Sequence, residues 1–243
     1  MDASANWSLN IANILKAAFE NDDSVHALWL EGSVAQGCQD EMSDLDVWIS
    51  IDTGTNEIVL NKIRTQLEKL GTLDIDYQMP QHHKELSHQV FHLENTPACH
   101  TVDINLQDIT RDVTLTESVD DYMVVFDKSG VIKSATPHDG DIDFVNVRQK
   151  ALQYYKLQKP NITKNLNREQ PLEALVYYRY LVEYIIKMER LKTTPFKNEY
   201  DLKHIYRDLD RGFVKFIESL LFINQKSLTK ALDDIKAYID KYI

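Results

Sequence analysis

Two aspartates alternate with apolar residues in the segment Ser43-Asp44-Leu45-Asp46-Val47. Residues two apart in a β-strand point to the same face, so a strand here would project both carboxylates together. Carboxylates held this close repel one another, and a cation between them relieves the repulsion. Magnesium takes hard oxygen ligands and leaves coordination positions open for substrate phosphates. The pair therefore indicates a magnesium platform, although a half-exposed strand with one polar face has the same pattern.

A small turn, Gly32-Ser33, follows the apolar run from Val25 to Leu30. Glycine lets the backbone approach a ligand closely, and the N–H groups at the start of a helix can face an anion. The Ser33 hydroxyl could then contact a phosphate oxygen. The segment lacks the Gly-Lys-Ser/Thr ending of a P-loop, and an ordinary strand–turn–helix connection is the alternative interpretation.

A third carboxylate, Asp103, lies in the strand-like segment HTVDINLQD between the apolar residues Val102 and Ile104. A strand here that neighboured the first one would bring Asp103 beside Asp44 and Asp46. Two metal ions about 4 Å apart can activate an attacking oxygen and stabilise a leaving phosphate. Three carboxylates are a reasonable set of ligands for that arrangement.

Other residues compete with this assignment. Asp74 and Asp76 form a second alternating pair, but no Gly-Ser turn precedes them, and a strand with one polar face explains them. Zinc is a further alternative because several histidines crowd one region: His82, His83, His88, His92 and His100. Neither a paired cysteine spacing nor an HExxH pattern accompanies these histidines, so zinc is the weaker hypothesis.

The elements that position these residues can be predicted from hydrophobic periodicity. In residues 1–142 we expect an α/β domain. Its helices should cover 9–19 and 58–70, the second capped by Gly71. Its strands should cover 25–31, 45–51, 72–79, 88–94, 100–108 and 122–126. In residues 143–243 the pattern predicts an all-α helical bundle, with helices over 145–158, 171–190, 197–209, 211–223 and 227–242.

The composition is that of an ordinary globular protein of 243 residues, with 43% hydrophobic and 27% charged residues. No apolar run approaches the roughly 18 residues of a membrane span, and the first residues do not resemble a signal peptide. We therefore expect a cytoplasmic protein without a membrane partner. The net charge of −11 disfavours broad binding of nucleic acid, where Lys and Arg must neutralise phosphates, and weakly favours a cationic small molecule.

Together, the Gly-Ser turn at 32–33, the SDLDV segment at 43–47 and the VDIN segment at 102–105 resemble the nucleotidyltransferase superfamily signature. The resemblance implies a polymerase-β-like palm with a short mixed sheet. It implies that Gly32 and Ser33 bind the triphosphate and that Asp44, Asp46 and Asp103 hold two Mg²⁺ ions.

A helical domain after such a palm resembles the aminoglycoside and lincosamide adenylyltransferases, in which a Pro-Lys segment precedes a helix. On that resemblance Lys197 reaches the triphosphate, whereas a solvated lysine in a first helical turn is the alternative. Glu94 is the candidate for the separate glutamate base that some members carry, although a surface glutamate is the simpler interpretation.

The activity so implied is transfer of AMP from ATP to a hydroxyl of a small acceptor, with release of pyrophosphate. The acceptor could be an aminoglycoside or lincosamide antibiotic, which would make the protein an antibiotic-resistance enzyme. Two alternatives stay open: a nucleotidyltransferase-like binding module without turnover, such as an antitoxin or sensor, and a nucleotidyltransferase acting on protein or RNA.

Overall fold

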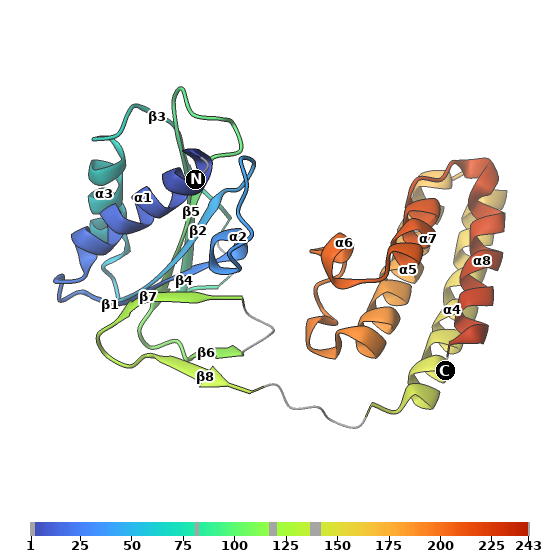
Figure 1. The fold of residues 1–243 in the computed structure, drawn as a ribbon. Helices are drawn as coiled ribbons and strands as arrows, with labels where there is room; N and C mark the ends of the chain where they lie inside the picture. Colours follow the sequence, from blue (N-terminus) through green and yellow to red (C-terminus); the bar gives the residue numbers. More distant parts are fainter. Residues whose placement is uncertain (1–2, 81–82, 117–120, 137–141, 243) are drawn as a thin grey trace. The chain divides into compact units, whose positions relative to one another are not determined.

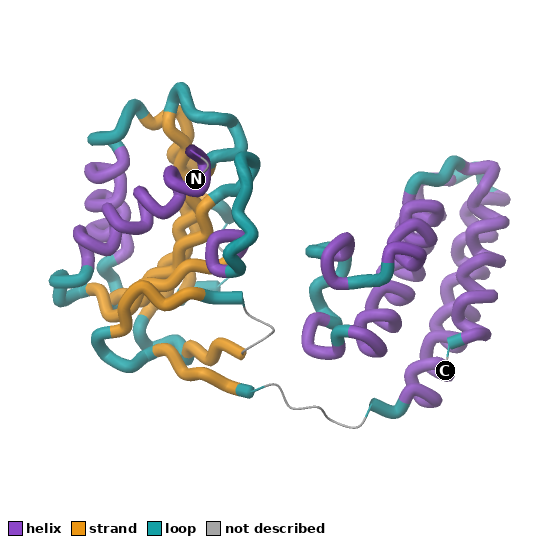
Figure 2. The backbone as a smooth tube through the Cα atoms, viewed as in Figure 1, coloured by secondary structure: helices purple, strands orange, loops and turns teal. Residues whose placement is uncertain are grey.

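The computed structural model describes residues 3–80, 83–116, 121–136 and 142–242. The chain divides into two compact units, Met1–Pro137 and His138–Ile243. The first combines helices with β-strands, and the second contains helices and no described strand (Figures 1 and 2). None of the helices in the described part of the chain has the length and hydropathy that crossing a bilayer requires.

The first unit is built on a six-stranded mixed sheet with the strand order β3-β4-β5-β2-β1-β7. The strands are β1 (Val25–Glu31), β2 (Leu45–Ile51), β3 (Leu73–Gln78), β4 (Leu86–Leu93), β5 (Thr101–Asp108) and β7 (Met123–Asp127). Only the central pair, β2 and β5, is parallel, and the other neighbours are antiparallel. The mixed α/β sheet predicted from the sequence is confirmed.

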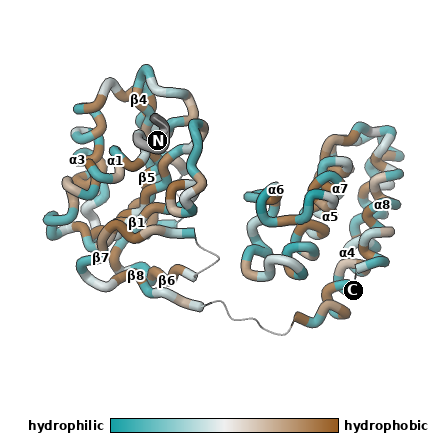
Figure 3. The backbone as a smooth tube through the Cα atoms, viewed as in Figure 1, coloured by the Kyte–Doolittle hydropathy of each residue, from teal (hydrophilic) through white to brown (hydrophobic). Residues whose placement is uncertain are grey.

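One face of this sheet is covered by α1 (Ala3–Phe19) and α3 (Asn56–Leu67) (Figure 1). The buried core between them contains Ile11 and Phe19 from α1, Ile63 from α3, and Leu28 and Val47 from the strands. Figure 3 shows the apolar residues concentrated along β1 and the neighbouring strands. The predicted helix over 58–70 is shifted: α3 ends at Leu67 with Glu68 at its C-cap, so Gly71 is not the cap.

The other face carries a smaller apolar cluster and a two-stranded parallel sheet, β6 (Val113–Thr116) paired with β8 (Ile132–Ala135). Trp29 of β1 stacks on Trp48 of β2 with ring centroids 5.8 Å apart, and Val113 and Leu115 join this cluster. The small sheet therefore packs against β1 and β2 on this face.

A partly exposed ion pair follows the end of α1. Lys62 Nζ lies 2.8 Å from Asp22 Oδ2, and the backbone N–H and hydroxyl of Ser24 donate to Asp22 Oδ1. Burial opposes ionisation of this carboxyl, but the hydrogen bonds from Lys62 and Ser24 outweigh it and lower the pKa of Asp22 to about 2.

Because the folded pKa of Asp22 lies below the unfolded value of 3.8, its contribution is complete above pH 4 and is lost as the pH falls toward 2. Because solvent screens this partly exposed pair, we expect Asp22→Asn to lower the free energy of unfolding by about 1 kcal/mol at pH 6. The difference from wild type should shrink as the pH falls from 4 to 2, measured by urea unfolding across this range. If the free energies of unfolding of the two proteins differed by the same amount at every pH, the lowered pKa of Asp22 would be contradicted.

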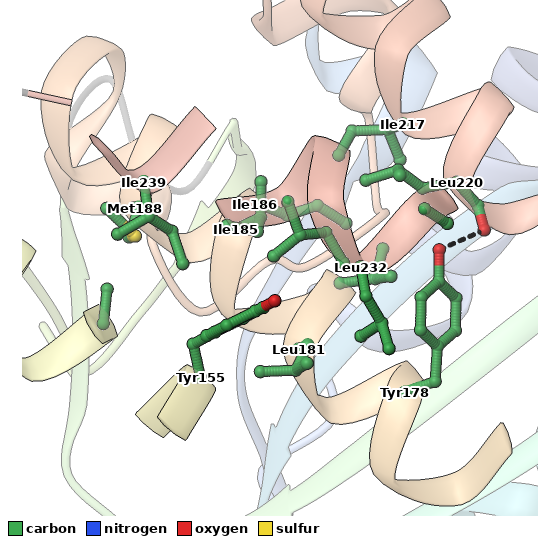
Figure 4. Packing of buried hydrophobic residues seen from close by; sticks show 14 of the residues in the cluster. Tyr155, Tyr178, Leu181, Ile185, Ile186, Met188, Ile217, Leu220, Leu232 and Ile239 are labelled. Atoms are coloured by element: carbon green, nitrogen blue, oxygen red, sulfur yellow. Dashed lines mark hydrogen bonds between the residues drawn. The ribbon is translucent and has the colours of Figure 1, made fainter. Parts of the chain in front are cut away.

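The second unit consists mainly of α4 (Phe144–Asn167), α5 (Pro171–Thr193), α7 (Arg211–Leu221) and α8 (Leu228–Lys241). Their apolar faces form one core, in which the buried Tyr178 hydroxyl donates to the Leu220 carbonyl over 2.8 Å (Figure 4). The helix predicted over 145–158 instead continues through Pro160 to Asn167. A proline inside a helix removes a backbone hydrogen bond, and complete burial of the apolar Ile162 side chain helps to offset that loss.

The helix predicted over 197–209 is wrong for most of its length. The structure has a 3₁₀ turn, Pro195–Lys197, then turns, and a short helix α6 (Ile205–Asp208). Asp201 and His204 adopt left-handed backbone conformations, with φ of 48° and 59°. The guanidinium of the fully buried Arg190 donates hydrogen bonds to the backbone carbonyls of Asp201 and Lys203. These carbonyls therefore accept from a side chain and not from the backbone N–H groups of a helix.

Candidate active site

Three carboxylates meet at the end of the sheet where β2 and β5 begin. Asp46 and Asp103 are direct partners in the parallel register of these strands, and Asp44 immediately precedes β2. One ligand oxygen from each of Asp44, Asp46 and Asp103 lies within 4.8 Å of the others. We call this group the acidic triad. The strand pattern predicts this convergence, and binding of metal by the triad stays a prediction.

The apolar residues between these acids fix their direction. Leu45 and Val47 flank Asp46, Val102 and Ile104 flank Asp103, and all four are buried in the core beneath the sheet. Asp46 and Asp103 alternate with them and so lie on the opposite face. A slip of one residue in register would bury the acids and expose the apolar side chains, so the core holds the triad in place.

The turn after β1 is fitted closely to Asp46. Gly32 has φ of +67° and begins the short helix α2 (Gly32–Ala35), and the preceding Glu31 is the β1 partner of Asp46. A Cβ atom added to Gly32 would lie 2.2 Å from Asp46 Oδ2, a distance that no real side chain tolerates. Both the backbone conformation and the approach of Asp46 therefore require glycine here.

Two polar atoms of the site are buried without a hydrogen-bond partner in the described chain: Ser33 Oγ and Asp103 Oδ1. Buried polar atoms in folded proteins are nearly always paired, so atoms of this kind point to a missing ligand. A divalent cation bound to the triad would pair with the carboxylate, and a phosphate oxygen would pair with the hydroxyl. Three carboxylates on one face fit Mg²⁺, because they supply hard oxygen ligands and their mutual repulsion falls when a cation binds.

The competing acids are engaged elsewhere. Asp74 Oδ1 lies 2.6 Å from His92 Nδ1, and this hydrogen bond raises the pKa of His92 above its ordinary value. Asp76 Oδ2 accepts a hydrogen bond of 2.5 Å from Arg64, and Gln89 also donates to Asp76. Neither aspartate belongs to the triad. Among the residues that the structure describes, no other group of three His, Cys, Asp or Glu side chains has metal-binding geometry.

The zinc alternative therefore has no support in the described chain. Besides His92, His100 is occupied: its ring stacks on Trp7 with centroids 4.6 Å apart, and its Nε2 lies 3.1 Å from the Glu41 carbonyl oxygen. His82 lies outside the described residues.

Two predicted residues lie away from the triad's strands. Glu94 is exposed in the turn after β4 and is not a member of the triad. Lys197 belongs to the second unit, where its side chain is mostly buried and its Nζ lies 4.0 Å from Asp208 Oδ1. A freely solvated lysine is therefore excluded, and contact between Lys197 and a triphosphate stays a prediction.

His88 is a neighbour of the triad that the sequence interpretation did not assign to the site. It lies on β4, and its Nε2 is 3.6 Å from Asp103 Oδ2. The alternation of β4 placed His88 on a polar face, but only the pairing of β4 with β5 shows that this face is shared with Asp103. The residues around His88 do not indicate which strand β4 pairs with.

Residues 10–99 match the family model described as a nucleotidyltransferase domain. The match includes Gly32, Ser33, Asp44 and Asp46, and it ends shortly before Asp103. No curated protein matches the sequence.

Several solved structures resemble the chain at low identity. Spectinomycin adenyltransferase AAD(9) from Enterococcus faecialis is 11% identical, with 97% of this chain and 99% of that chain covered and a TM-score of 0.30. The GLD-2/RNP-8 complex is 14% identical, with 98% and 78% covered and a TM-score of 0.35. The Cid1 poly(U) polymerase is 14% identical, with 44% of this chain covered and a TM-score of 0.31, and the chain spans only 33% of that polymerase. Scores of this size do not decide between acceptors.

Proposed function

We propose that this chain, whose residues 10–99 match a nucleotidyltransferase domain, transfers AMP from ATP to a hydroxyl group of a small molecule. The observation that supports the proposal best is the acidic triad beside the Gly32-Ser33 turn. The turn offers a hydroxyl and a closely approaching backbone for phosphate, and the triad offers ligands for the cations that accompany a triphosphate.

In the proposed reaction the acceptor oxygen forms a bond to the α-phosphorus, and the bond from that phosphorus to the oxygen bridging to the β-phosphate breaks. Pyrophosphate leaves with the bonding electron pair, and the hydroxyl proton is released to solvent in the net reaction. Two Mg²⁺ ions, when bound, supply positive charge to the attacking and leaving oxygens.

The chain's own residues orient the reactants. Asp44 and Asp46 would hold both ions, and Asp103 would hold the one nearer the acceptor. Ser33 would donate its hydroxyl to a phosphate oxygen, with Gly32 allowing the close approach. In the second unit, the Lys197 ammonium would bind the triphosphate on exchanging Asp208 for phosphate. Groups fixed in advance around developing charge are the largest source of rate enhancement in most enzymes.

The acceptor we propose is a hydroxylated small molecule, with aminoglycoside and lincosamide antibiotics as the first compounds to test. The protein would then act in the cytoplasm as an antibiotic-resistance enzyme. The net charge of −11 supports a small molecule over nucleic acid, since a polyanion would meet a repelling surface.

An acceptor panel with α-labelled ATP and Mg²⁺ tests the proposal. Kanamycin, lincomycin, an RNA oligonucleotide and a protein extract would each be incubated with enzyme, and products read by label and by mass. Labelled antibiotic with release of pyrophosphate supports the proposal. Label in RNA or protein alone would show that the acceptor is a macromolecule and not a small molecule. The absence of label in every arm, despite binding of Mg·ATP, would favour a binding module without turnover.

A further inference from the structure

The strand order arranges the groups of the site in sequence across the sheet. Gly32 and Ser33 follow β1, Asp44 and Asp46 lie at the start of β2, Asp103 lies on β5, and His88 lies on the next strand, β4. The proposed phosphate-binding turn and His88 are thus on opposite sides of the triad. In a displacement at phosphorus the attacking and leaving oxygens are roughly in line on opposite sides. If phosphates bind at the Gly32-Ser33 turn, His88 lies on the side from which the acceptor would arrive.

His88 has a nitrogen available for a ligand. Its Nε2 is buried and has no hydrogen-bond partner in the described chain, although 35% of its side chain is exposed. The 3.6 Å separation from Asp103 Oδ2 exceeds a hydrogen-bond distance. The buried ring nitrogen therefore lies beside the triad and has no partner, which a hydroxyl group of a ligand can supply.

A pocket of about 240 Å³ begins at His88 and extends away from Asp103 along β4 and β5. The residues that line it are apolar (Met79, Pro80 and Leu86) or polar (His83, Ser87 and Asn105), besides His88 itself. The described residues that line it include no Asp, Glu, Lys or Arg. A pocket of this size and lining suits an uncharged ring or a short apolar arm of a ligand.

We propose that this pocket binds the acceptor and that His88 Nε2 forms a hydrogen bond with its reacting hydroxyl group. The inference rests on the proposed function and narrows its acceptor to a hydroxylated molecule that has an uncharged, partly apolar portion. A compound with an ammonium group on every ring would have no counter-charge in this pocket. His88 orients the acceptor oxygen, and the bonds made and broken are those of the reaction already described.

Two substitutions at one position test the role of His88. His88→Leu removes the hydrogen bond, whereas His88→Gln keeps an amide group near the position of Nε2. With lincomycin as acceptor, we expect His88→Leu to lower kcat/KM for lincomycin about 10- to 100-fold, the usual effect of losing one hydrogen bond to a substrate. KM for ATP should stay within about twofold, and His88→Gln should recover most of the loss. A general loss of folded enzyme would lower kcat, would leave both KM values unchanged, and would not be rescued by glutamine.

An NMR experiment measures binding of the acceptor separately from its turnover. In the wild-type protein with Mg²⁺ and a non-hydrolysable ATP analogue, lincomycin should shift the NMR signals of the His88 ring, and kanamycin should not. Unshifted His88 signals with lincomycin, or equal lincomycin kinetics in wild type and His88→Leu, would overturn the inference while leaving the nucleotidyl transfer intact. If lincomycin shifts the His88 signals in this experiment but no labelled product forms in the acceptor panel with ATP, the pocket is supported and the proposed function is contradicted.

Discussion

Asp46→Asn is expected to lower nucleotidyl transfer about a thousandfold or more while the protein remains folded. The substitution keeps the size of the side chain and removes its charge from the centre of the triad, between Asp44 and Asp103. The remaining carboxylates bind divalent cations less tightly, and the charge that stabilises the phosphoryl oxygens is lost with the ions. Initial rates of pyrophosphate release at saturating ATP and Mg²⁺ measure the loss, and thermal unfolding measures the integrity of the fold.

Asp76→Asn is the matched control for this variant. Asp76 is also a strand aspartate of the first unit, but it pairs with Arg64 and lies outside the triad. We expect Asp76→Asn to reduce stability modestly and to keep activity within about threefold, because partly exposed ion pairs contribute little. Equal losses of activity in the two variants would mean that the triad has no special role.

Gly32→Ala should produce the second-largest loss, about a hundredfold or more in kcat/KM. The new methyl group would overlap Asp46 Oδ2, so either this carboxylate or the turn carrying Ser33 must move. A displacement of about 1 Å at a reacting centre costs on the order of a hundredfold in rate. Alanine in the left-handed conformation would also destabilise the fold by about 1–2 kcal/mol.

Gly37→Ala separates the two effects of that substitution. Gly37 has nearly the same φ, +65°, and a Cβ atom there would meet nothing within 4 Å. The strain is therefore matched and the overlap is absent. Gly37→Ala should lose similar stability in urea unfolding and retain near-normal activity. A comparable loss of activity in both variants would assign the effect to strain in the turn and not to the position of Asp46.

The sequence predicts the core of the site because its signals are local. The strands over 25–31 and 45–51 have the predicted bounds, since their apolar residues are recognisable as buried runs ended by glycine or by polar residues. The direction of Asp46 follows from the same alternation. Predicting that Asp103 lies close to Asp44 and Asp46 required the further assumption that β5 is the neighbour of β2. The structure shows that these two strands are parallel neighbours.

The remaining features depend on contacts between distant residues. The strands β6 and β8 have four residues each and pair only with one another, so neither has enough periodicity to be recognised alone. The segment 197–209 has helical composition, but the buried guanidinium of Arg190 binds two of its carbonyls and holds it in turns. His88 joins the site through cross-strand pairing alone.

Anomalous scattering from a crystal of the protein grown with Mn²⁺ and a non-hydrolysable ATP analogue would test the central claim most directly. We predict two manganese peaks bound by Asp44, Asp46 and Asp103, with phosphate oxygens beside Ser33. Manganese bound elsewhere, as at Asp74 and Asp76, or nucleotide bound with no metal at the triad, would contradict the account.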